Sequence, residues 1–91
     1  MSRRRYDIDW TRSAFRGLDR LPEKAAVACI EFVYGALAEN PQRVGGTLRR
    51  DLDGKRSARR GDFRVICEID EEAGSVTIIA VAHRSDVYRT H

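Results

Sequence analysis

Arginine is the residue type in this chain that is best suited to chemistry, and it is concentrated in one segment. Between positions 41 and 64 there are eight basic residues, seven of them arginine, against three acidic ones. Such a focus of positive charge attracts polyanions, and arginine contacts phosphate through paired N–H groups. We predict that the segment Arg43–Arg64 binds RNA; the alternative is an ordinary solvated face. The residues expected to dock RNA are Arg49, Arg50, Arg56, Arg59 and Arg60.

A smaller set of side chains could act on phosphate together. The residues lie at the ends of three expected strands: Lys55, Arg59, Arg64, His83, Arg84 and Tyr88. The end of one strand lies beside the start of its antiparallel neighbour, so we expect Arg64 and His83-Arg84 to meet at one edge of a sheet. The sequence therefore predicts a basic site at that edge.

This set suits cleavage of RNA by its own 2′-hydroxyl, which attacks the neighbouring phosphate. Arginines would stabilise the negative charge of the phosphorane, and a His, Lys or Tyr would transfer the protons. Tyr88 could instead stack on a base. The reaction requires no metal ion or cofactor. Taken singly the residues have ordinary alternatives, because Arg64 could form an ion pair with Glu68 or Asp62 and His83 could be structural.

Sequence motifs for other chemistries are missing. We find no phosphate-binding P-loop, no dinucleotide fingerprint and no metalloprotease helix motif. Cys29 and Cys67 lie in apolar runs without zinc-ligand spacing, so we expect two buried thiols in a reducing cytoplasm. No apolar stretch approaches the ~20 residues of a membrane span, and no apolar region follows the basic residues of Met1–Arg5. We expect a cytoplasmic protein without a membrane partner.

The elements that must position these residues follow a β-α-α-β-β-β order in one domain, residues 1–91. Patterns of alternating or continuous apolar residues predict strands at four places: Tyr6–Trp10, Lys55–Arg59, Phe63–Ile69 and Ser75–Ala82. Thr11 or Ser13 is expected to cap the first helix, and Leu21-Pro22 separates it from the second. Residues 42–54 are expected to form a loop. The fold class is α+β, with an N-terminal helical hairpin packed on a small, antiparallel-rich twisted sheet.

Two details of these elements bear on the site. Four apolar residues in the second helix recur at spacings of four, three and four and predict its buried face: Ala26, Ile30, Val33 and Leu37. Alternation along Phe63–Ile69 places Arg64 on the side of the sheet away from the core. The run Val76–Ala82 is nearly all apolar, which predicts a central strand buried on both faces.

The sequence resembles the RelE/ParE superfamily of bacterial toxins, and its RelE branch more closely. The resemblance runs through nearly the whole chain, and its most specific parts are Gly61-Asp62-Phe63-Arg64-Val65 and Ala82-His83-Arg84-x-x-x-Tyr88. It implies a ribosome-dependent mRNA endonuclease of a type II toxin–antitoxin system. It also implies neutralisation by a cognate RelB-like or Phd-like antitoxin.

The resemblance also implies residue roles. Arg64 matches the phosphate-stabilising arginine, Arg84 the second active-site arginine and Tyr88 the C-terminal tyrosine. Some members carry two lysines two positions apart where this chain has Lys55 and Ser57. Others have a histidine in the place of His83, so the general base remains open between Lys55 and His83. The alternatives are a ParE-like DNA gyrase inhibitor without nuclease activity, and a degenerate toxin that only binds an antitoxin or an operator.

Overall fold

The computed structural model describes residues 5–41, 46–47 and 55–83. Strand β1 (Asp7–Trp10) is followed by helices α1 (Arg12–Arg20) and α2 (Glu23–Phe32), which continues into the π-helical turn η1 (Val33–Leu37). Strands β2 (Gly46–Thr47), β3 (Lys55–Arg60), β4 (Phe63–Asp70) and β5 (Ser75–His83) complete the described chain. No helix among these residues is long and apolar enough to cross a membrane.

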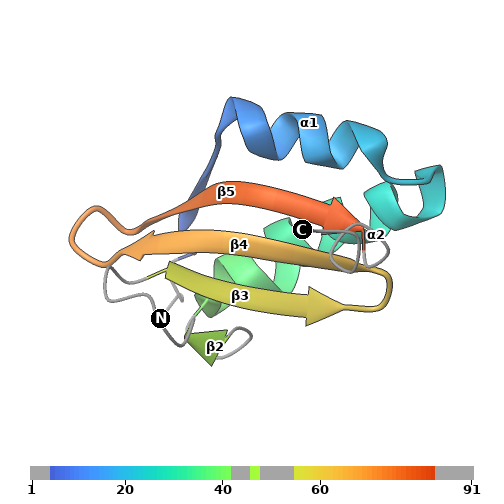
Figure 1. Ribbon diagram of the computed structural model, residues 1–91. Coiled ribbons are helices and arrows are strands. Elements are labelled where there is room, and N and C mark those ends of the chain that lie inside the picture. The colour runs from blue at the N-terminus through green and yellow to red at the C-terminus, as the bar shows by residue number, and fades with distance from the viewer. Residues whose placement is uncertain (1–4, 42–45, 48–54, 84–91) are drawn as a thin grey trace.

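The strands form a single mixed sheet in the order β1-β5-β4-β3-β2 (Figure 1). Strand β1 pairs parallel to β5, and the other neighbours are antiparallel. The predicted α+β fold is confirmed, and so is the central position of β5. The prediction that residues 42–54 are only a loop is wrong, because Gly46 and Thr47 pair with Ser57 and Arg56. A strand of two residues is too short to show any alternation in the sequence.

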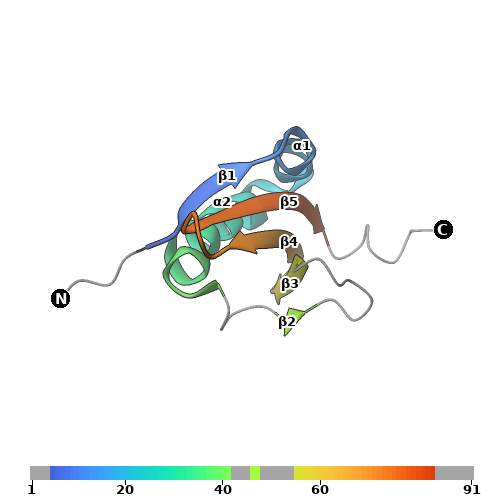
Figure 2. The same ribbon diagram turned by 90° about the vertical axis from the view of Figure 1, so that its left-hand side faces the viewer.

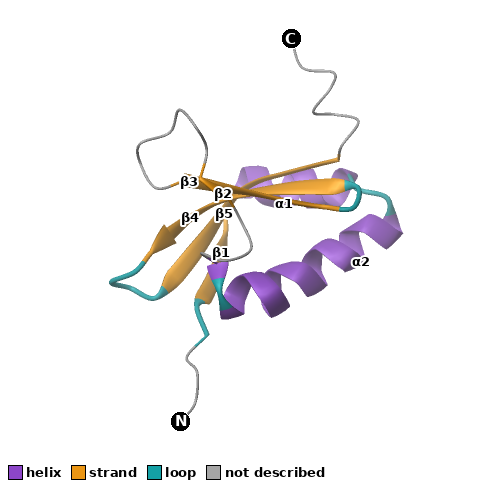
Figure 3. Ribbon diagram, turned by 90° about the horizontal axis from the view of Figure 1, so that it is seen from below, coloured by secondary structure: helices purple, strands orange, loops and turns teal. Residues whose placement is uncertain are grey.

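Helix α2 packs across one face of the sheet, α1 lies along β5 beyond the end of β1, and the core lies between the helices and the sheet (Figure 1 and Figure 2). Figure 3 shows α2 along one side of the strands, and Figure 2 shows α1 beside β1 and β5. The five largest fully buried side chains come from η1 and from the strands: Val33, Leu37, Val65, Val76 and Ile78. Both cysteines are buried and free, as predicted, and burial raises the pKa of each thiol to about 11.

The buried face of α2 differs from the predicted one. Ala25, Cys29 and Phe32 face the core, whereas Ile30 is 41% exposed and Ala26 is only partly buried. Val33 and Leu37 are buried as predicted. The cause is that α2 is apolar around most of its circumference, so two stripes compete, and that the π-helical turn changes the periodicity after Phe32.

Strand β5 is buried mainly on one face. Val76, Ile78 and Val81 are buried, while Ile79 and Ala80 are only partly buried. The prediction of burial on both faces is therefore wrong, because α2 covers one face of the sheet and no helix among the described residues covers the other (Figure 3). We call the side of the sheet turned away from α2 the far face (Figure 3).

Candidate functional site

The register of β3 and β4 decides which basic side chains share a face. Ala58 pairs with Val65, and both are buried against the helices. Residues at odd positions of β3 therefore point to the far face, since side chains alternate along a strand. On this face Lys55 lies opposite Glu68, Ser57 opposite Ile66, and Arg59 opposite Arg64. The predicted orientation of Arg64 agrees with this register.

Arg59 and Arg64 form a directly opposed pair of like charges. Such a pair destabilises a sheet, because the two guanidinium groups repel each other across the strands. No ion pair joins Arg64 to Glu68 or Asp62 in the described ranges 5–41, 46–47 and 55–83, so the predicted structural alternative for Arg64 is not observed there. The pair is therefore suited to bind an anion that lies between the two side chains.

The Nε atom of Arg64 is a second feature that favours anion binding. It is buried and has no hydrogen-bond acceptor among the residues that the structure describes. A buried donor without an acceptor costs about 1–3 kcal/mol. A phosphate oxygen is an acceptor of the right charge, and its hydrogen bond to a guanidinium would be charge-assisted.

A β-bulge in β5 changes which of its side chains point to each face of the sheet. Cys67 pairs with Ile78 and the preceding residue of β4, Ile66, pairs with Ala80, so Ile79 has no partner on β4. Beyond the bulge Arg64 pairs with Ala82 and Phe63 pairs with His83. Partners on neighbouring strands point to the same face. His83 therefore lies at the same end of the sheet as Arg64, as predicted, but on the helix side.

Lys55 shares the far face but lies at some distance from the arginine pair. The two residues, Lys55 and Arg59, are four positions apart on β3, which corresponds to about 14 Å between their Cα atoms at about 3.4 Å per residue. Its cross-strand partner is Glu68, and the neighbouring residue on β5, Thr77, pairs with Asp9 of β1. The far face is thus acidic near Lys55 and basic near Arg64. This polarity would orient a polyanion toward the arginines.

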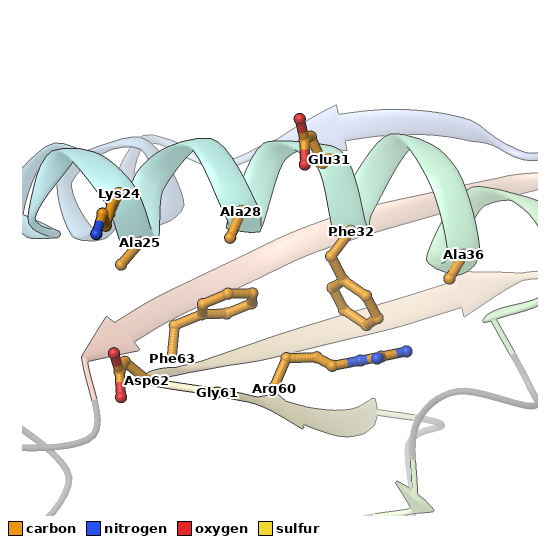
Figure 4. A pocket seen from close by; sticks show the side chains of 10 residues that line it. All are labelled: Lys24, Ala25, Ala28, Glu31, Phe32, Ala36, Arg60, Gly61, Asp62 and Phe63. Carbon is orange, nitrogen blue, oxygen red and sulfur yellow. The ribbon is translucent and has the colours of Figure 1, made fainter.

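Two of the arginines predicted to dock RNA lie on the other side of the sheet. Arg56 pairs with the buried Cys67, and the guanidinium of Arg60 lies 4.8 Å from the ring centroid of Phe32. Arg60 borders a groove of about 560 Å³ between α2 and the β3–β4 turn (Figure 4). These two side chains are thus separated from Arg59 and Arg64 by the sheet.

The remaining predicted site residues, Arg49, Arg50, Arg84 and Tyr88, lie outside the described residues. Sequence reasoning missed Ala82, whose small side chain neighbours Arg64 across β4 and β5. Nothing in the uniformly apolar run of β5 marks the bulge that brings Ala82 to this position.

Comparisons with known proteins agree with this arrangement. The family model for the ParE toxin of the type II toxin–antitoxin system parDE matches residues 8–88. The chain is 54% identical to the toxin RelE of Mycobacterium tuberculosis, over 92% of this chain and 87% of that protein. This chain belongs to the RelE/ParE family of type II toxins. A second relative, the toxin RelG of the same organism, is 45% identical over 92% of this chain and 97% of RelG.

Solved structures of RelE/ParE toxins share the fold. One chain of the RelBE2 toxin–antitoxin complex from Mycobacterium tuberculosis superposes with a TM-score of 0.83 at 44% identity, covering 90% of this toxin and 94% of that chain. A chain of the archaeal RelE–RelB complex from Pyrococcus horikoshii gives 0.70 at 23% identity, with 89% and 97% covered. The resemblance to RelE is therefore confirmed in both sequence and fold.

Proposed function

We propose that this toxin is a metal-independent endoribonuclease that cuts mRNA on the translating ribosome. The observation that carries the proposal is the opposed pair Arg59–Arg64 on the far face, with the small residue Ala82 beside Arg64. The two guanidinium groups would bind the scissile phosphate and stabilise the charge of the phosphorane as the 2′-hydroxyl attacks. The products would be a 2′,3′-cyclic phosphate and a 5′-hydroxyl.

The proton transfers are proposed to involve the far face as well. Of the two candidates for the general base, Lys55 shares this face with Arg64, and His83 pairs with Phe63 on the helix side. We therefore favour Lys55 over His83. For Arg84 and Tyr88 the resemblance to the family is the only support. We propose that Arg84 is the second arginine of the site and that Tyr88 stacks on the substrate.

The experiment that tests this function is primer extension on an mRNA that is being translated. Wild-type toxin should produce cuts that require ribosomes, and Arg64→Ala should lower their rate by about 10²–10³-fold, the usual effect of removing one charge-stabilising donor. Arg16→Ala is the matched control, because Arg16 is an exposed arginine of α1. The proposal fails if Arg64→Ala cuts as fast as Arg16→Ala. Breaks in DNA that depend on gyrase, without cuts in RNA, would instead support the ParE-like alternative.

We also propose that a RelB-like antitoxin binds and neutralises this toxin. The support is the similarity to the RelBE2 and RelE–RelB complexes, in which the related chains assemble with an antitoxin. Co-expression with the product of the neighbouring gene, followed by size-exclusion chromatography, should give one stable complex and restore growth. A Phd-like partner would be recognised by its own sequence in the same purification.

A further inference from the structure

The bulge in β5 determines which residue lies beside Arg64. If the strands continued one-to-one from the pair Cys67–Ile78, Val81 would be opposite Arg64 and His83 would turn to the far face. The extra residue Ile79 instead places the small Ala82 there. A register shift by one residue exchanges the two faces of a strand, and bulges often re-aim side chains next to active sites.

Thr11 contacts the bulge directly. Its backbone N–H donates to the carbonyl oxygen of Ile78 over 3.1 Å, and its Oγ1 lies 3.0 Å from the carbonyl oxygens of both Ile78 and Ile79. The hydroxyl has one proton, which it can donate to either oxygen or share between them. Thr11 thus contacts the carbonyl group of the last residue paired before the bulge, Ile78, and that of the unpaired residue Ile79.

The same hydroxyl also caps helix α1. Its oxygen accepts a hydrogen bond of 3.0 Å from the backbone N–H of Ala14, and Thr11 has the extended backbone typical of an N-cap. Thr11 follows Trp10, which pairs with Ile78 at the end of β1. One side chain therefore joins the end of β1, the start of α1 and the bulge of β5. The hydroxyl oxygen accepts a hydrogen bond from the helix, and the hydroxyl proton is donated to the bulge.

We propose that Thr11 is a positioning residue for the phosphate site, because its hydroxyl proton holds the β5 bulge and so keeps Ala82 beside Arg64. The expected effect of Thr11 on cleavage rests on the ribonuclease function proposed above. The structural part, that Thr11 selects the register of β5, stands separately. In the competing register the larger Val81 would lie next to Arg64 in place of Ala82, and a misplacement of about 1 Å at a reacting group can cost about 10²-fold in rate.

Three substitutions separate the two roles of the hydroxyl. Thr11→Ser keeps both the acceptor and the donor. Thr11→Asp keeps a good helix cap but has no proton to donate at neutral pH. Thr11→Val has nearly the shape of threonine and keeps neither. Thr11→Asp also turns a carboxylate toward the carbonyl oxygens of Ile78 and Ile79, so thermal unfolding should show both variants destabilised, and only Thr11→Val loses the helix cap as well.

The decisive measurements are the rate of ribosome-dependent cleavage and the NMR cross-strand NOEs between the backbones of Arg64 and Ala82. We expect Thr11→Ser to match the wild type in both. Thr11→Asp and Thr11→Val should cleave at least ~10-fold more slowly and lose these NOEs. Wild-type cleavage by Thr11→Asp would overturn the proposal, and so would slower cleavage with the NOEs unchanged. If the wild type itself does not cleave RNA, the ribonuclease function fails, and the NOEs alone still decide whether Thr11 holds the register.

Discussion

Gly17 allows α1 to lie directly against β5, and replacing it with alanine tests how close that contact is. A Cβ built on Gly17 overlaps the carbonyl oxygen of Val81 and lies 2.9 Å from its carbonyl carbon. Both are backbone atoms of the central strand, so they cannot rotate away. The helix would have to move off the sheet, and Ala14, which is fully buried on the same helix, would move with it.

The magnitude follows from two opposing effects. Alanine in place of glycine inside a helix stabilises it by about 1 kcal/mol, whereas overpacking a well-packed contact costs about 1–3 kcal/mol or more. Because backbone atoms cannot move aside, we take the overpacking cost at its upper end, about 3 kcal/mol. After the helix gain of about 1 kcal/mol is subtracted, we expect Gly17→Ala to lower the free energy of unfolding by about 2 kcal/mol. For a domain of this size that corresponds to a fall in Tm of about 10 °C.

Gly35 provides the matched control. It lies in η1, and a Cβ added there meets nothing within 4 Å. Gly35→Ala should therefore raise the free energy of unfolding by up to about 1 kcal/mol. Thermal or urea unfolding of both variants, each purified away from any antitoxin, measures the difference. A Gly17→Ala variant as stable as Gly35→Ala would refute the close packing of α1 on β5.

Three further outcomes are expected. His83→Gln should cleave mRNA within about twofold of the wild type, whereas Lys55→Met should be severely impaired; the opposite result in the primer-extension assay would make His83 the base. Arg84→Ala should relieve toxicity in cells that lack the antitoxin, and undiminished growth arrest would contradict its assignment. Cys29 and Cys67, whose pKa values burial raises to about 11, should resist iodoacetamide at pH 8 until the protein unfolds, as mass spectrometry would show. The unfolded thiols ionise first as pH rises, so stability should fall from about pH 9 to pH 11, and rapid labelling of the folded toxin would argue against their burial.

The sequence predicts most of the fold because its elements are short and clearly separated. Glycines at the two tight turns, Gly61 and Gly74, have φ values of +52° and +68°, which explains why the turn positions could be read from the sequence. The buried face of α2 could not, because apolar residues occupy both candidate stripes. Only contact with the sheet decides between Cys29, which is buried, and Ile30, which is exposed.

The sequence predicts how the site residues of β3 and β4 are oriented, but not those that follow the bulge in β5. Simple alternation correctly places Arg64 and Lys55 on one side of the sheet, because β3 and β4 pair without interruption. It fails for His83, since the run before it is apolar at every position but one and carries no sign of an inserted residue. The residue that contacts the bulge is Thr11, which is distant in sequence and gives no local sign of an inserted residue in β5.

The position of β5 has a consequence for how the toxin folds. This strand lies between β1 and β4 and carries the contacts of α1, yet it follows all of these elements in the chain. Thr11 and Ile79, which meet at the bulge, are 68 positions apart. Contacts so distant in sequence slow folding, because the loop between them must close first. On the ribosome that makes it, the chain cannot assemble the proposed phosphate site until β5 has emerged, so the apolar surfaces of β1, α1 and β4 stay exposed until then. A binding partner present at that stage would meet a partly folded chain before it meets an active toxin.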